Sequence, residues 1–252
     1  MIYIKITLFT AILLFSFFGP YNGYLNHSPF NNNHYLNVSD GESIDKTISK
    51  ISDFNLLNKL FLRIYLNNNE INNFQAGEYQ LNNKILKEII NDLSNGKTVT
   101  HKLSINEGIT IYQLNKIIDE SYLINDCDML KCIKTELSFK EGILFPDTYY
   151  YKKNMPASSI LQKSHDILNN HLNYYFKNKD SNNSLNKEEI LILASIIEKE
   201  AGNNEEKFKI SSVFLKRLSI GMKLQADPTI IYGLLPNFDG DIKKSDILDR
   251  NN

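Results

Sequence analysis

The 252-residue sequence has no tryptophan, only two cysteines and almost no net charge, with 28 basic against 29 acidic side chains. Two cysteines cannot supply the four clustered ligands of a structural zinc site or the framework of a disulfide-rich module. A net charge of −1 provides no basic surface for phosphates, so nucleic acid is not an expected partner. The sequence also lacks a glycine-rich phosphate-binding loop, which disfavours nucleotide-dependent chemistry. Its 42% hydrophobic and 23% charged residues are ordinary globular values, which exclude wholesale disorder and a polytopic membrane protein.

A long apolar run opens the chain. Between Ile2 and Phe18 the only charged side chain is Lys5. This run predicts a membrane helix near the lower length limit for spanning, because Lys5 can snorkel and Tyr21 and Tyr24 suit the opposite interface. A cleaved signal peptide is the alternative, but no small-x-small cleavage site is visible after the run, so we favour an uncleaved anchor.

The basic residues set the expected orientation. After the apolar run no Lys or Arg occurs before Lys46, so the positive-inside bias leaves the N-terminus cytoplasmic. The sequence therefore predicts a single-pass protein of the inner membrane, with residues 1–24 as the anchor and the functional part extracytoplasmic.

Cys127 and Cys132 are five positions apart in this exported part. A disulfide is chemically allowed there. If the stretch is helical, however, their Cα atoms are too far apart to be bridged. We therefore favour two unpaired, half-buried thiols.

The exported part is predicted to be α+β. Residues 25–40 are polar and Asn-rich, which is typical of a linker, and residues 180–184 have the composition of a solvated hinge.

Residues 41–140 alternate short helices and strands, and residues 141–252 are expected to form a mostly helical domain. Helices are predicted at 43–50, 56–66, 84–93, 111–118 and 158–176, and strands at 75–81 and 98–105.

The segment from residue 185 to residue 202 is the most informative. Asn186 is a plausible N-cap with Glu189 at the N3 position, and Gly202 is a stop signal. At 100° per residue, Glu200 has Ile196 and Ile197 as its neighbours on the helix surface, so its carboxyl is expected to project from the packed face.

A buried carboxyl at the C-terminal end of a helix is suited to general acid chemistry. Desolvation and the negative end of the helix dipole would both raise the pKa of Glu200 and hold its proton at neutral pH. The alternative is an exposed glutamate at a helix end, or a core carboxyl paired with a lysine.

Two further helices are expected after residue 202. Asn203 and Glu206 predict a capping box, and Gly221 ends the helix that follows. Asp227 is then expected as the N-cap of a short helix with Pro228 at its first position. The alternative for Asp227 is a sugar-binding acceptor beside Glu200.

Several motifs occur in a recognisable order along the chain. They are Ala76-Gly77-Glu78-Tyr79, Glu107-Gly108, Glu141-Gly142 running into Phe145-Pro146-Asp147-Thr148, the stretch 193–200, and the stretch 212–233. Together they resemble the MltG (YceG-like) family of endolytic murein transglycosylases, and the resemblance covers essentially the whole chain.

This resemblance implies a membrane-anchored protein with a LysM-like subdomain, within residues 41–140, and a catalytic domain similar to the soluble lytic transglycosylases. Such enzymes cut the β-1,4 bond between N-acetylmuramic acid and N-acetylglucosamine in nascent peptidoglycan, leave 1,6-anhydromuramoyl ends and so limit strand length. The second Glu of the family's Glu-Lys-Glu motif is its catalytic residue, which is Glu200 here. No metal or cofactor is expected. Peptidoglycan glycan strands are the expected partners, and family analogy adds cell-wall synthases.

Other side chains are candidates for binding sugar or positioning Glu200. They are Ser195, Glu198, Gln225, Asp227 and Tyr232.

A single catalytic carboxyl can suffice for the cleavage reaction, because the muramic C6 hydroxyl is tethered to the reacting sugar and replaces water. The alternative mechanism is attack by water, assisted by Asp227 or Glu205, which would leave a reducing end.

The sequence departs from the family pattern after Tyr232-Gly233. Family members continue there through a Tyr-Asn-Thr-Tyr-like stretch and a Gly-Leu-Pro-Pro turn that this sequence lacks. The catalytic domain is therefore expected to be C-terminally incomplete, with an open active site. Two alternatives follow: a catalytically inactive peptidoglycan-binding or scaffold protein, and a gene product that does not fold stably.

Overall fold

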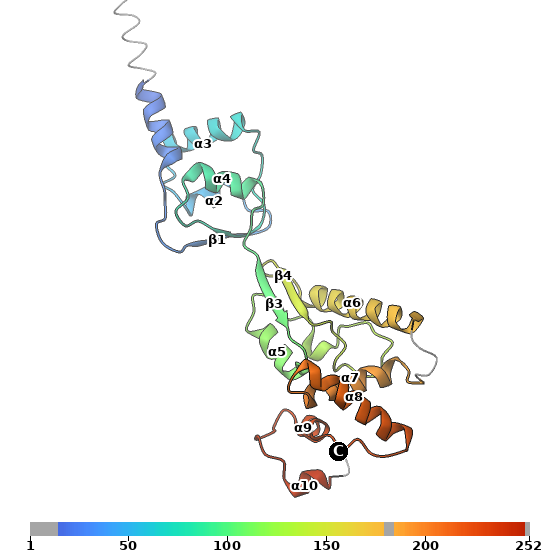
Figure 1. The fold of residues 1–252 in the computed structure, drawn as a ribbon. Coiled ribbons are helices and arrows are strands. Elements are labelled where there is room, and N and C mark those ends of the chain that lie inside the picture. Colours follow the sequence, from blue (N-terminus) through green and yellow to red (C-terminus); the bar gives the residue numbers. More distant parts are fainter. Residues whose placement is uncertain (1–14, 179–183, 250–252) are drawn as a thin grey trace, which may run out of the picture. The chain divides into compact units, whose positions relative to one another are not determined.

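The computed structural model describes residues 15–178 and 184–249, in two compact units (Figure 1). The first unit extends to His101 and the second begins at Lys102. Helices combine with small sheets in both, which confirms the predicted α+β class. The boundary that we expected after residue 140 falls inside the second unit.

Unit 1 contains a two-stranded antiparallel sheet packed with helices. Its elements are β1 (Tyr35–Val38), α2 (Ile44–Ser49), α3 (Leu56–Asn68), β2 (Gly77–Gln80) and α4 (Leu86–Ser94). Leu36 of β1 is opposite Tyr79 of β2 in the register of the sheet. Both side chains are buried, and the core beneath them includes Phe61 and Leu62 of α3 and Ile90 of α4. The helices predicted at 43–50, 56–66 and 84–93 are confirmed, with slightly shifted ends.

The helix before β1 belongs to the same unit. Residues 15–26 are helical, and Tyr24 and Leu25 are buried in the unit 1 core. Tyr24 therefore lies in a protein core rather than at the expected membrane interface. Most of the predicted membrane segment falls on residues 1–14, outside the described residues. Within the described ranges, no helix is long and apolar enough to cross a membrane.

Residues 25–40, expected to be a linker, are folded in part. They contain β1, and Leu36 and Val38 of this strand are buried. The sequence pattern missed this strand because only two apolar residues alternate in it, which is a weak signal among so many asparagines.

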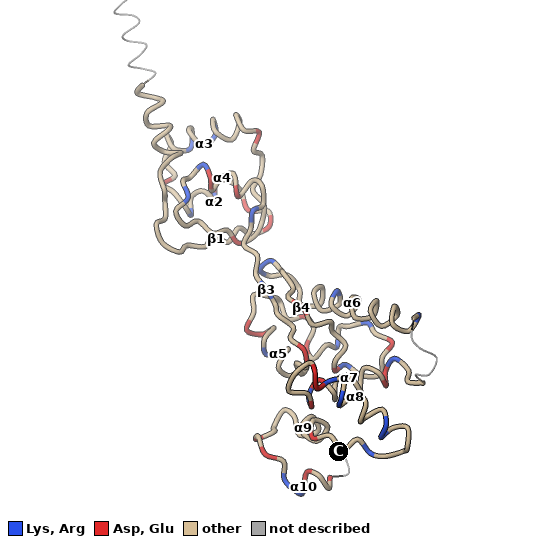
Figure 2. The backbone as a smooth tube through the Cα atoms, in the orientation of Figure 1, with Lys and Arg blue, Asp and Glu red and all other residues tan. Residues whose placement is uncertain are grey.

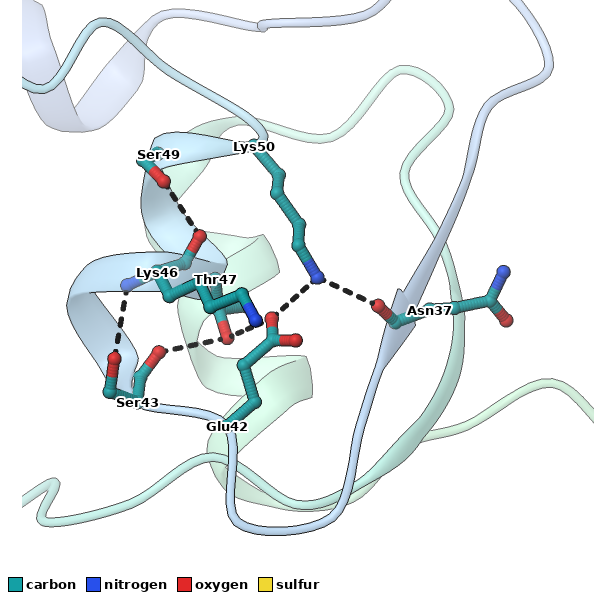
Figure 3. Close-up of polar contacts among 7 residues, drawn as sticks. All are labelled: Asn37, Glu42, Ser43, Lys46, Thr47, Ser49 and Lys50. Carbon is teal, nitrogen blue, oxygen red and sulfur yellow. Dashed lines mark hydrogen bonds and ion pairs between the residues drawn. The ribbon is translucent and has the colours of Figure 1, made fainter.

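A buried carboxylate holds the loop before α2 against the helix (Figure 3). The Glu42 side chain is 2% exposed, and its carboxylate accepts hydrogen bonds from Lys50 Nζ at 2.6 Å and from the Thr47 hydroxyl at 3.0 Å. Lys50 also donates to the carbonyl of Asn37 in β1, at 3.3 Å. This contact joins α2 to the sheet.

We expect the Glu42 contact to make unit 1 sensitive to acid. The Lys50 ammonium, with help from Thr47, holds the pKa of Glu42 below its ordinary value although burial opposes this. Because the pKa is lower in the folded state, the stabilisation is present above the unfolded-state pKa and is lost as the pH falls through the folded-state value. Replacing Glu42 with Gln should lower the free energy of unfolding by about 1–2 kcal/mol at neutral pH. In urea unfolding, this difference from wild type should shrink below about pH 4, and a constant difference would contradict the assignment.

Unit 2 begins inside a strand, which is followed by a turn and a helix. β3 (His101–Ile105) and β4 (Asp147–Tyr151) form a second two-stranded sheet. The remaining elements are α5 (Ile111–Asp119), the short 3-10 turn η1 (Asp128–Leu130), α6 (Ala157–Asn178), α7 (Lys187–Glu200), α8 (Asn204–Ser219), α9 (Asp227–Leu234) and α10 (Lys244–Ile247). Leu103, Ile118, Tyr149 and Leu161 form part of the core between the sheet, α5 and α6. The predicted helices and strands are again confirmed, while the hinge expected at 180–184 lies almost entirely outside the described residues.

The helices α7, α8 and α9 share a much smaller core. Leu193, Phe214 and Ala226 are its buried members. Phe208 and Val213 of α8 are 79% and 50% exposed. Only one side of α8 therefore has a partner among the described residues.

Cys127 and Cys132 form a disulfide, with their Cα atoms 5.0 Å apart, so the expectation of two free thiols is wrong. The expectation assumed a helix. The segment instead makes the short turn η1, in which Met129 and Leu130 have φ angles of 49° and 56°. This backbone brings the two Cα atoms within the range that a disulfide can span.

We expect removal of this disulfide to destabilise unit 2. The bond closes a short loop and restrains the unfolded chain, which gives about 2 kcal/mol by the loop-entropy relation. The double variant Cys127→Ser/Cys132→Ser should therefore unfold at lower urea concentration than wild type. Reductant should lower the midpoint of wild type and leave that of the double variant unchanged. Equal midpoints for the two proteins without reductant would contradict the prediction.

Candidate functional site

The start of α7 fixes the register of the helix that carries Glu200. The Asn186 side chain accepts a hydrogen bond from the Glu189 N–H at 3.0 Å, and the Glu189 carboxylate accepts one from the Asn186 N–H at 2.8 Å. This is the predicted capping box. The helix ends at Glu200, and Ala201 is its C-cap, whose N–H donates to the carbonyl of Ile197 at 3.0 Å. Glu198 and Glu200 are thus both in the last turn.

Glu200 is exposed, so its expected burial on a packed face is wrong. Ile196 and Ile197 are only partly buried, because the small core of this region covers the side of α7 that carries Leu193. The amphipathic pattern identified the apolar side correctly, but the described residues do not cover all of it. The carboxyl is therefore accessible to a polymer arriving from solvent.

The turn before α5 lies against the end of α7. Gly108 has a φ of 65°, and a Cβ added to it would be 3.4 Å from Glu198 Cγ and from Lys199 Cε. The Glu198 carboxylate is 2.7 Å from Lys207 Nζ of α8, and both side chains are 30% exposed. Glu198 therefore joins α7 to α8 beside Glu200. Figure 2 shows the acidic residues of this helix end close to those at the start of α8.

The first turn of α8 is held to the end of α7 by a second glutamate. Asn203 is the N-cap of α8, as predicted, and its side chain accepts from the Glu206 N–H at 3.0 Å. The Glu206 carboxylate accepts from the Gly202 N–H at 2.9 Å, one residue before the cap. The turn after Glu200 is thereby fixed.

Glu141 connects α5 with α9. Its two oxygens are 3.1 and 3.4 Å from the backbone N of Ile111, the first residue of α5. The Tyr232 hydroxyl of α9 is a neighbour of this carboxylate and interacts with it electrostatically. Burial first, and then the neighbouring Glu141 carboxylate and Tyr112, raise the pKa of the Tyr232 hydroxyl. Tyr232 therefore stays protonated beside Glu141.

Two other candidates, Ser195 and Asp227, are exposed on α7 and α9. Ser195 is exposed, and its hydroxyl donates to the Ile192 carbonyl at 2.8 Å, within its own helix. Asp227 is exposed and is the first residue of α9, so its expected role as N-cap is wrong. The N-cap is Ala226, whose carbonyl accepts from the Thr229 N–H at 3.1 Å and from the Thr229 hydroxyl at 2.7 Å. The helix therefore starts one residue earlier than expected.

Gln225 lies in the turn that leads into α9. It is exposed and has a φ of 54°, in the left-handed region that non-glycine residues seldom adopt. The Leu224 carbonyl just before it accepts a hydrogen bond from the Arg217 side chain of α8. The structure thus brings α9 and its preceding turn onto α7 and α8, and Tyr232 onto Glu141.

Glu141 and Tyr112 are not among the site residues expected from the sequence. The sequence signal for Glu141 is the Glu141-Gly142 motif, one of the motifs that carry the family resemblance. Nothing in residue spacing links Glu141 to Tyr232, because the contact depends on how α9 packs.

A shallow depression of about 340 Å³ lies at the other end of α7. Its lining residues are Thr135, Glu136, Leu137, Asn169, Asn186, Lys187 and Glu188. The length of α7, about 20 Å at 1.5 Å per residue, separates it from Glu200. It is therefore distinct from the candidate site.

These features define the class of the protein: an α+β chain of two units, with an accessible glutamate at the end of a capped helix. Residues 36–252 match the YceG-like family, and the chain belongs to that family. It is 30% identical over 230 residues to the endolytic murein transglycosylase of Bacillus subtilis (strain 168), covering 78% of this chain and 62% of the relative.

The chain is also similar to two further proteins. The endolytic murein transglycosylase of Streptococcus pneumoniae (strain ATCC BAA-255 / R6) is 25% identical over 234 residues, covering 78% of this chain and 42% of the relative. A crystal structure of a YceG-like protein from Listeria monocytogenes aligns with a TM-score of 0.49 at 26% identity, covering 86% of this chain and 80% of that one. The chain spans less than two thirds of the length of these curated relatives.

Proposed function

We propose that this chain is an endolytic murein transglycosylase. It would cut the β-1,4 bond between N-acetylmuramic acid and N-acetylglucosamine within peptidoglycan strands and leave 1,6-anhydromuramoyl ends. Membership of the YceG-like family and the names of the curated relatives support this function. The observation that carries it is the accessible carboxyl of Glu200, in the last turn of a helix whose two ends are both fixed.

In this proposal Glu200 acts first as an acid and then as a base. It donates its proton to the departing glycosidic oxygen as the bond from C1 to that oxygen breaks. The resulting carboxylate accepts the proton of the muramic C6 hydroxyl as that oxygen bonds to C1, which returns Glu200 to its starting form. No water is consumed. The tethered hydroxyl replaces the second carboxylate that ordinary glycosidases need.

A bound glycan would also change the surroundings of Glu200. Sugar rings lying over the end of α7 would remove water from the carboxyl, and desolvation favours the protonated form that a general acid needs. We assign this desolvation to the substrate, because Glu200 is exposed in the free protein.

The neighbouring side chains would bind sugar or position the helices. Exposed Ser195, Gln225 and Asp227 would offer hydrogen bonds to the glycan. Glu198 would fix the end of α7 through Lys207, and Tyr232 would position α9 through Glu141.

The placement in the cell is also proposed. The apolar run of residues 2–18 would anchor the chain in the inner membrane, with both units outside the cytoplasm. The unit formed by β1, α2, α3 and β2 would be the LysM-like subdomain that holds peptidoglycan strands. Cell-wall synthases would be neighbours at the membrane.

Product analysis tests the proposed reaction. Purified glycan strands would be incubated with the full chain in detergent, and the products analysed by mass spectrometry. The proposal expects new ends with a 1,6-anhydro ring, which are lighter by one water than reducing ends. New reducing ends would instead assign water attack assisted by Asp227 or Glu205. Binding to isolated sacculi without any cleavage would contradict the enzymatic function.

A further inference from the structure

The first half of α3 exposes three leucines. Leu56, Leu57 and Leu60 are 87%, 52% and 48% exposed. Leu57 is one turn before Phe61, which is buried, so the exposed leucines border the side of α3 that packs into unit 1. We call Leu56, Leu57 and Leu60 the α3 leucine patch. Its exposure needs an explanation, because large apolar side chains grouped on one surface mark an interaction site.

The α3 leucine patch is close to the end of the apolar N-terminal run. The ring centroids of Phe17 and Tyr21 are 5.5 and 5.6 Å from that of Phe61. Phe15 and Phe18, in the same helix, are 80% and 51% exposed. Phe17 belongs to the apolar run that ends at Phe18, and Tyr21 follows it closely. The end of the apolar run therefore packs directly against α3.

The charge of α3 complements an anionic lipid surface. Between Leu56 and Asn68 the helix carries Lys59 and Arg63 and no acidic residue. Lys59 is bound to Asp45 at 2.5 Å, and Arg63 is exposed one turn after Leu60. Exposed leucines with a nearby cationic side chain are typical of a helix that lies in the lipid headgroup region.

We propose that the α3 leucine patch inserts into the membrane surface beside the N-terminal helix, so that unit 1 rests directly on the bilayer. The partner is a lipid surface containing anionic lipids. The inference rests on the membrane placement proposed above, since the N-terminal run must first bring α3 to the bilayer. It adds a second contact that fixes the orientation of unit 1 relative to the membrane.

Fluorescence of a single label tests this inference. The full chain would carry an environment-sensitive dye at Leu57→Cys and be reconstituted into vesicles of phosphatidylethanolamine and phosphatidylglycerol. The matched control carries the dye at Lys97→Cys, an exposed position in the same unit, whose side chain is 75% exposed. We expect the emission of the Leu57 label to shift to shorter wavelength and to be quenched by lipids with nitroxides just below the headgroups. The Lys97 label should show neither change. A label at Leu60→Cys should repeat the Leu57 result.

Each outcome has a separate meaning. If the chain floats with vesicles but the Leu57 and Lys97 labels behave alike, the α3 inference is wrong while the membrane placement stands. If the Leu57 emission shifts with protein concentration in detergent and does not respond to nitroxide lipids, a second copy covers the patch and the inference is overturned. If the chain does not float with vesicles, the membrane placement fails and the inference fails with it. None of these results depends on transglycosylase activity, so the proposed reaction is tested separately.

Discussion

Replacing Glu200 with Gln is expected to abolish nearly all formation of anhydromuropeptides. The amide cannot donate a proton to the departing glycosidic oxygen or accept one from the C6 hydroxyl, so both halves of the proposed reaction lose their catalyst. A positioned general acid–base group contributes about 10²- to 10⁴-fold to a rate, and this is the expected loss. The measurement is the initial rate of release of anhydro ends by wild type and variant at equal protein concentration.

The same substitution should leave the fold unchanged. Glu200 is exposed, and Gln is close to it in size and in helix propensity, so the free energy of unfolding measured in urea should change by less than about 0.5 kcal/mol. The matched control is Glu120→Gln, at the end of α5, where the side chain is 67% exposed and pairs with Lys116 in its own helix. This control removes one carboxylate from unit 2 and should keep full activity. Equal rates for wild type and Glu200→Gln would refute the assignment of the catalytic residue.

The local elements of the chain could be predicted because their signals lie within a few residues of one another. Asn186 and Glu189 are three positions apart and form the predicted capping box at the start of α7. Ser43, where the first predicted helix begins, is the N-cap of α2. Such contacts depend on backbone geometry alone, so sequence spacing is enough to identify them.

The environment of Glu200 could not be predicted in the same way. The helical wheel shows which side of α7 is apolar, but it does not show which part of that side a neighbour covers. Leu193 is buried by Phe214 and Ala226, residues that are distant in the sequence, whereas Glu200 is not covered. The helical wheel and the family motif both select Glu200 as the candidate catalytic residue. Its burial, however, depends on tertiary packing, which the periodicity of the sequence does not determine.

The disulfide shows a related limit. Whether Cys127 and Cys132 pair depends on the backbone between them, and the prediction assumed a helix there. Met129 and Leu130 adopt positive φ angles, which their residue types do not signal. The expectation of two free thiols was therefore wrong.

Removing the interaction between Glu141 and Tyr232 is expected to lower activity about tenfold or more, through the position of α9 and not through contact with the reacting atoms. Tyr232→Phe removes only the hydroxyl that lies beside the Glu141 carboxylate. Because α9 packs against α7, losing this interaction allows α9 and the preceding turn with Gln225 to shift relative to Glu200. A displacement of about 1 Å in a positioning element can cost up to about 10²-fold in rate. The measurement is kcat and KM for release of anhydro ends.

The Glu141→Ala variant should lose activity by the same route and also lose stability. Its carboxylate accepts from the Ile111 N–H at the start of α5, and removal of such an acceptor costs about 1–2 kcal/mol. Thr110→Ala is the matched control, since Thr110 caps the same helix through the Gln113 N–H at 3.3 Å. It should destabilise α5 by about 1 kcal/mol yet keep its activity at temperatures where the protein is folded.

The double variant decides whether Glu141 and Tyr232 act as one unit. If both substitutions break the same link, the loss of rate in Glu141→Ala/Tyr232→Phe should be no larger than that of the more damaging single variant, because coupled residues are not additive. Residues that affect the rate independently would multiply their losses. A multiplied loss, or full activity in Tyr232→Phe, would show that the contact between α5 and α9 does not position the site. A loss confined to kcat, with KM unchanged, would indicate that the link acts by orienting Glu200 against the bond that breaks, since a displaced sugar-binding group would raise KM as well.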